Sequence, residues 1–162
     1  MKNFHIFIML FLIFLSACAN RNITPYGNFV SLKAPINVVL NDALAEIEKK
    51  FSPENTVFIL AHNFNDHFGR AFIEQIRFKG YGIVPFDPKK FTQKDNKNNS
   101  LIKAKVEDTT RQFVVLSFTL IPISQTNFFV LSLKYNEDSV HRAYFEEKNA
   151  IFAAGPWTYE KR

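Results

Sequence analysis

The first well-patterned part of the chain alternates hydrophobic and polar positions with a helical period. Apolar residues recur every three or four positions over residues 35–51, which predicts an amphipathic helix that packs through one face. This helix is expected to end just before Pro53, because proline disfavours helical geometry in the residue that precedes it. Glu46 and Lys50 are four residues apart, and we place them on the wetter side of the helix as an ion pair.

A continuous apolar run and a second helical pattern follow. Residues 56–61 are apolar and rich in β-branched side chains, which predicts a buried strand. Residues 66–79 have the spacing of a one-faced helix. Asn65 or Asp66 can cap the free amides at its start, and Gly80 suits a left-handed residue at its end.

The rest of the chain is predicted to be mainly strands. A strand over 82–86 completes a right-handed βαβ unit with the preceding strand and helix, in which the two strands are parallel. Beyond residue 100 the apolar runs are short and separated by turns, which predicts an antiparallel meander with strands at 102–106, 113–120, 128–135, 140–145 and 151–159, the last broken at Gly155-Pro156. The predicted fold is α+β, with two helices packed on a mostly antiparallel sheet.

Composition agrees with one globular domain. The 162 residues are 47% apolar and 22% charged, which excludes disorder and collagen-like repeats, and 19 phenylalanines are available for the core. The net charge of +5 is mild and its basic residues are scattered, so binding to nucleic acid is not expected. The polar segment 87–100, with four lysines, is predicted to be an exposed loop, with a partner or phospholipid contact as the alternative.

The N-terminus has the pattern of an export signal. Lys2 is followed by an apolar run over residues 6–15 and then by Ser16, Ala17 and Cys18. Ten apolar residues are too few to span a bilayer as a helix. The small pair before the cysteine resembles the bacterial lipobox, in which the thiol is acylated and the chain is cut before it. The alternative is an ordinary signal peptide that contains a cysteine.

The lipobox divides the chain into three parts. Residues 1–17 are the lipoprotein signal peptide, residues 18–28 the lipidated N-terminus and tether, and residues 29–162 a single globular periplasmic domain. Acyl chains hold a protein to a membrane by about 0.8 kcal/mol per buried methylene. Ala19, in place of aspartate, favours transfer to the outer membrane by similarity to Gram-negative lipoproteins.

His62, Asp66 and His67 are the nearest approach to a ligand or catalytic cluster. The two histidines are five residues apart, which does not fit the i,i+4 spacing of a helical metal site, so we interpret all three as polar turn residues, with Asp66 as a cap. His141 is placed at the surface of a strand. The sequence contains no G-x-S-x-G motif and no phosphate-binding glycine-rich loop. No enzymatic activity, metal or cofactor is therefore predicted, and a hydrolase built on His62, Asp66 and His67 is kept as an alternative.

Short segments in a set order along the chain carry a resemblance to a known family. They are the lipobox at 15–18 and the segments 26–30, 50–56, 66–69, 77–83, 142–144 and 154–158. Each is common by itself, but in this order and spacing they make the chain resemble the TrbH family of conjugal-transfer lipoproteins.

The resemblance implies a structural role in the cell-envelope channel of a type IV secretion system. Such a lipoprotein helps to fix a ring of partner subunits to the outer membrane. The implied partners are outer-membrane lipid, through acylated Cys18, and other channel proteins. Trp157 and Tyr159 are the candidate partner contacts, because exposed aromatic residues are enriched at interaction hot spots; alternatively, they close the core.

A second function remains open at this point. The protein could be a free-standing envelope lipoprotein that binds peptidoglycan, lipid or another small ligand. A deep apolar pocket would favour that function, whereas a filled core with exposed aromatic side chains would favour the channel component.

Overall fold

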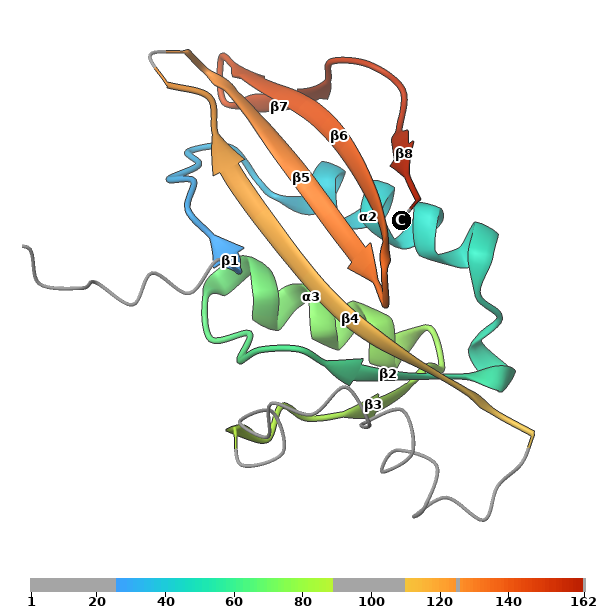
Figure 1. Cartoon of the computed structure of the whole chain (residues 1–162). Coiled ribbons are helices and arrows are strands. Elements are labelled where there is room, and N and C mark those ends of the chain that lie inside the picture. The colour runs from blue at the N-terminus through green and yellow to red at the C-terminus, as the bar shows by residue number, and fades with distance from the viewer. Residues whose placement is uncertain (1–25, 89–109, 125, 162) are drawn as a thin grey trace, which may run out of the picture.

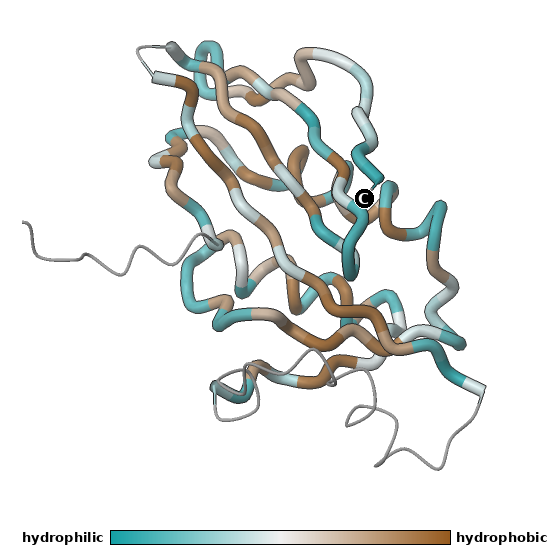
Figure 2. Tube along the Cα trace, viewed as in Figure 1, coloured by the Kyte–Doolittle hydropathy of each residue, from teal (hydrophilic) through white to brown (hydrophobic). Residues whose placement is uncertain are grey.

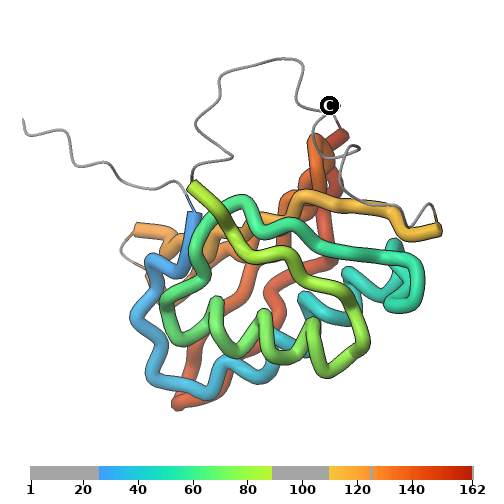
Figure 3. Tube along the Cα trace, turned by 90° about the horizontal axis from the view of Figure 1, so that it is seen from below, coloured from blue at the N-terminus to red at the C-terminus, as the bar shows by residue number. Residues whose placement is uncertain are grey.

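The computed structural model describes residues 26–88, 110–124 and 126–161, which form two layers. Helices α2 (Asn37–Lys50) and α3 (His67–Phe78) pack against one face of a mixed sheet, as Figures 1 and 3 show from two directions. No described helix covers the other face, which we call the outer face. The predicted α+β class, with two helices on a mostly antiparallel sheet, is confirmed.

The sheet has the strand order β3-β2-β4-β5-β6-β7, with β1 paired to β4 and β8 paired to β6. Strands β1, β2 and β3 run parallel to their neighbours, and the later pairs are antiparallel. The bounds are β1 (Gly27–Asn28), β2 (Thr56–Leu60), β3 (Gly82–Val84), β4 (Gln112–Pro122), β5 (Phe128–Tyr135), β6 (Asp138–Glu147), β7 (Ala150–Ala153) and β8 (Thr158–Glu160), with a 3-10 turn at Pro53–Asn55.

Strand β2, helix α3 and strand β3 form the predicted parallel βαβ unit. Asp66 caps α3, since its side chain accepts a hydrogen bond from the N–H of Gly69 at 2.8 Å. Gly80 follows the helix with a φ of +91°, and the N–H of Tyr81 donates back to the carbonyl of Ile76. Local signals in the sequence thus set both ends of α3.

The predicted meander is present as strands β4 to β7. In the β5–β6 turn, Asn136 has a positive φ and lies in the left-handed region of backbone conformation. Lys148 and Asn149 have the same conformation in the β6–β7 turn. The last predicted strand is interrupted at Gly155-Pro156, and its two halves, β7 and β8, pair with opposite ends of β6.

Aromatic side chains fill the space between the helices and the sheet. Phe68 and Phe72 of α3 contact Phe118 of β4, with ring centroids 5.1 and 6.0 Å apart. Phe58 and Phe129 are also fully buried. Figure 2 shows hydrophobic residues concentrated along β2, β4 and β5, which cross the middle of the sheet. Phenylalanine therefore supplies the core, as the composition predicts.

The predicted surface pair between Glu46 and Lys50 is wrong. Glu46 is only 3% exposed and pairs with Lys49 at 2.9 Å, whereas Lys50 pairs with Asp138 at 3.0 Å. The C-terminal strand β8 brings Tyr159 to this side of α2. A position that helical periodicity assigns to solvent is therefore covered by a strand more than a hundred residues away.

Residues 27–28 fall in the predicted tether range but lie in the sheet as β1, because their backbone pairs with β4. The signal peptide 1–17, Cys18, most of the segment 87–100 and the strand predicted at 102–106 lie outside the described residues. Neither of the described α-helices is long and apolar enough to cross a bilayer.

Candidate functional site

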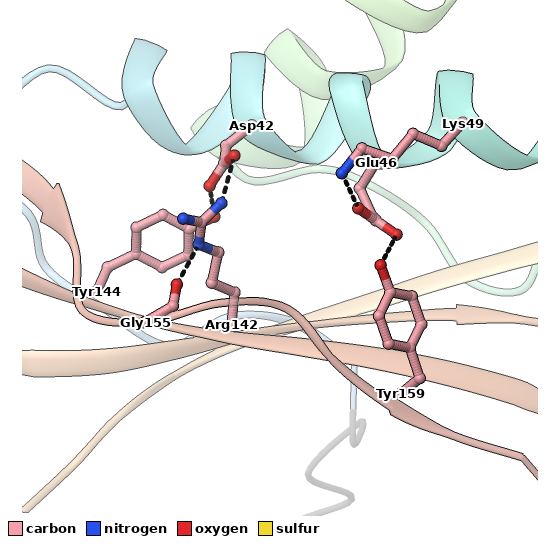
Figure 4. A network of polar contacts seen from close by, with 7 residues as sticks. All are labelled: Asp42, Glu46, Lys49, Arg142, Tyr144, Gly155 and Tyr159. Atoms are coloured by element: carbon pink, nitrogen blue, oxygen red, sulfur yellow. Dashed lines mark hydrogen bonds and ion pairs between the residues drawn. The ribbon is translucent and has the colours of Figure 1, made fainter.

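A network of polar contacts joins α2 to β6 and to the C-terminal segment (Figure 4). The carboxylate of Asp42 on α2 accepts hydrogen bonds from the Arg142 guanidinium at 2.7 Å and from the Tyr144 hydroxyl at 2.6 Å. Nε of Arg142 also donates to the Gly155 carbonyl at 2.8 Å. Two of the segments that carry the family resemblance, one around Arg142 and one around Gly155, therefore meet in this network.

Partial burial strengthens the hydrogen bonds of this network. The side chains of Arg142 and Asp42 are 21% and 23% exposed, so water competes little for their contact. Burial raises the pKa of Tyr144, and its hydrogen bond to Asp42 raises it further. The hydroxyl therefore stays protonated and donates to the carboxylate.

The two residues predicted to contact partners have different surroundings. Trp157 is partly buried against the core, and the Arg142 guanidinium lies 5.8 Å from its ring centroid. Tyr159 is 58% exposed, whereas its hydroxyl donates a hydrogen bond to the buried carboxylate of Glu46 at 2.8 Å (Figure 4). This hydrogen bond, together with burial of the hydroxyl, raises the pKa of Tyr159. Tyr159 thus presents an aromatic surface to solvent in a held orientation.

His62, Asp66 and His67 have separate roles. His62 is 8% exposed and stacks between Tyr26 and Phe64, with ring centroids 5.0 and 4.3 Å away. Burial lowers the pKa of His62. Asp66 caps α3, as predicted, and His67 is exposed in its first turn. His62 lies in the turn between β2 and α3, as predicted, but it is buried there because Tyr26 of the N-terminal segment covers it.

Two hollows in the described part of the chain are open to solvent. One, of about 450 Å³, lies beside His62 and Asp66 and is lined by residues 26–29 of the N-terminal segment. The other, of about 280 Å³, lies on the outer face and is lined mostly by hydroxyl and charged side chains. Neither is a deep apolar pocket of the kind that encloses a small ligand.

His141 lies in a row of polar side chains within the second hollow. Its Nδ1 is 2.8 Å from the hydroxyl of Ser132, and its Nε2 is 3.7 Å from the carboxylate of Glu160. Ser132 is in the middle of a central strand, where main-chain N–H groups donate within the sheet and are not available to stabilise an oxyanion. Among the described residues, no group of three or more His, Cys, Asp or Glu side chains could hold a metal ion.

Hydrophobic side chains gather at one end of the outer face. Phe128, Phe145 and Phe152, on β5, β6 and β7, are cross-strand neighbours with ring centroids 5.6 and 5.2 Å apart. Ile121 and Ile123 lie beside them at the end of β4. We call these five residues the apolar patch. All except Phe145 are between 39% and 47% exposed, which is unusual for such side chains when they form a cluster.

Sequence reasoning missed the apolar patch. The strict alternation in β5 does separate Phe128 from the buried Phe129 and Leu131. That alternation shows that the two sets face opposite sides, but the helices, which decide which side is covered, are distant in sequence.

The match to a known family covers all the described residues. Residues 23–162 match the family model described as conjugal transfer protein TrbH. The chain belongs to the TrbH family. No curated protein and no solved structure matches the chain. The match begins after Cys18, so the lipobox-like segment lies outside the residues that match the TrbH family model.

Asp42→Asn is expected to lower the free energy of unfolding by about 1.5–3 kcal/mol, because the carboxylate charge beside Arg142 and one of its two accepting oxygens are lost. Urea unfolding followed by circular dichroism measures this. Glu48→Gln is the matched control, since Glu48 pairs with Lys79 at 2.8 Å on the surface and such pairs contribute about 1 kcal/mol or less. Equal losses in the two variants would contradict the prediction.

His62 is expected to make the TrbH-family domain less stable in acid. Its pKa is lowered in the folded protein, so the unfolded chain binds a proton more readily, and stability falls as the pH drops below about 6.5. His62→Phe keeps an aromatic ring in the stack and should reduce the difference between urea midpoints at about pH 7.5 and about pH 5. His67→Gln, at an exposed position, is the control; a wild-type pH difference in His62→Phe would count against the prediction.

Proposed function

We propose that this TrbH-family protein is a structural subunit of a conjugative type IV secretion channel. It is anchored in the outer membrane through acylated Cys18, and its domain lies in the periplasm and binds other channel subunits. The observation that carries the proposal is the position of the lipobox directly before a chain that matches a conjugal transfer family over residues 23–162. A membrane anchor and a conjugation-related domain are thus joined by a short connection.

The shape of the domain supports a binding role rather than catalysis. The core between the helices and the sheet is filled by aromatic and aliphatic side chains. The two described hollows are open, and exposed aromatic side chains lie on the surface instead. This combination favours the channel subunit over the free-standing ligand-binding lipoprotein, which would need an enclosed apolar pocket.

Tyr159 is the best-placed partner contact on the described surface. Its ring is more than half exposed, and the hydrogen bond to Glu46 fixes its orientation before a partner binds. A held aromatic ring loses little conformational freedom on binding, which favours affinity. Trp157, by contrast, is partly buried and contacts Arg142.

Cys18→Ala is expected to give an unprocessed or soluble product without lipid, because the acylated atom is removed. Sucrose-gradient fractionation and mass spectrometry of the N-terminus measure the outcome. Ala19→Asp is the matched variant, which should remain acylated but fractionate with the inner membrane. Cleavage and outer-membrane fractionation of Cys18→Ala like those of the parent would overturn the anchoring proposal.

Tyr159→Ala is expected to reduce co-purification with channel subunits from gently solubilised envelopes, since it removes the exposed ring. Tyr159→Phe keeps the ring and loses the hydrogen bond to Glu46, so its loss should be smaller. Phe78→Ala, at an 86% exposed phenylalanine at the end of α3, is the control for removing surface apolar area. Unchanged co-purification of Tyr159→Ala would exclude this contact surface.

A further inference from the structure

We propose that the apolar patch docks onto the phospholipid surface beside the lipid anchor, so that one end of the outer sheet face lies in the membrane interface. This inference rests on the proposed anchoring at Cys18. It assigns a ligand class, phospholipid acyl chains, to the cluster of exposed large hydrophobic side chains on the described outer face, in which the rings of Phe128, Phe145 and Phe152 are neighbours.

The chemistry of the patch suits hydrocarbon. Its five side chains are isoleucine and phenylalanine, which carry no hydrogen-bonding group. Hot spots in protein interfaces are enriched in tryptophan, tyrosine and arginine, whose polar atoms pair with a partner. Side chains of pure hydrocarbon instead lose nothing on entering the boundary between head groups and acyl chains.

The position of the patch allows shallow insertion. Its members lie where β4 turns into β5 and where β6 turns into β7, so they project at one end of the sheet. The β6–β7 turn carries Lys148, whose side chain is 90% exposed and 3.7 Å from Glu147. Further along the outer face the side chains become polar, with Ser132 and His141 in the open hollow. One end of the face is therefore suited to lipid and the other to water.

The tether brings this end within reach of the membrane. Tyr26, stacked on His62, holds the start of the described fold, and β1 then runs beside β4 with Gly27 opposite Thr119. Ile121 is two positions further along β4, about 7 Å away. Eight peptide steps from Cys18 to Tyr26 span at most about 27 Å. The short connection keeps the patch at a high effective concentration near lipid, so even weak docking is populated.

The test uses the acylated mature protein in phospholipid vesicles. The chain has one tryptophan, so a Trp157→Phe, Phe152→Trp double variant reports from the apolar patch, whereas the parent reports from Trp157 at the edge of the core. We expect the reporter at position 152 to shift its emission to the blue on reconstitution and to be quenched by lipids brominated near the head group. The parent should show less quenching.

Two further substitutions in the double variant sharpen the result. Phe128→Asp places a charge in the patch and should abolish most of the quenching. Phe78→Asp changes an equally apolar residue that is 86% exposed on α3, and it should leave the quenching unchanged. Circular dichroism confirms that each variant is folded.

Vesicle flotation separates this inference from the anchoring on which it rests. If the protein floats with the vesicles and position 152 is not quenched, docking is overturned and the anchor stands. If the protein does not float, the anchoring fails and the docking inference fails with it. If quenching is absent but purified channel subunits shift the emission of the reporter, the patch binds protein rather than lipid, and the inference is likewise overturned.

Discussion

The contact between Asp42 and Arg142 joins the helix layer, the sheet and the C-terminal segment at one point. Arg142 lies on β6, which pairs with both β7 and β8, and its guanidinium also bonds the Gly155 carbonyl where the last strand is interrupted. With both side chains mostly buried, leaving either charge without its partner would cost several times what a surface pair contributes. Tyr159, four residues after Gly155, lies against the same helix through its hydrogen bond to Glu46.

Both described α-helices lie on one face of the sheet, so no described helix covers the outer face. There the side chains separate along the strands into the apolar patch and a row of hydroxyl and charged groups. Tyr159 projects elsewhere, beside Glu46 of α2. In the arrangement that we propose, the described part of the domain has separate surfaces for lipid and for protein.

The helices, most strands and the parallel βαβ unit could be predicted from the sequence because their signals are local. Asp66 and Gly80 mark the ends of α3 through contacts within a few residues. Errors arose where distant segments meet. Helical periodicity places Glu46 at the surface, but β8 covers it. Local pattern places His62 in a turn, where it does lie, but does not show that Tyr26 buries it. Only the fold shows that the two candidate partner contacts near the C-terminus differ: Trp157 packs against the core, whereas Tyr159 is exposed.

The sequence alone determined the α+β class, the approximate positions of both described α-helices and most described strands, and the family resemblance, since periodicity, capping residues and segment order are properties of the chain as written. It also contains the lipobox-like segment on which the anchoring proposal rests. The tertiary structure decided which face of the sheet the helices cover, and hence that Phe129 is core while Phe128 is surface. The physical reason is that burial depends on contacts between residues far apart in sequence, which no local pattern specifies.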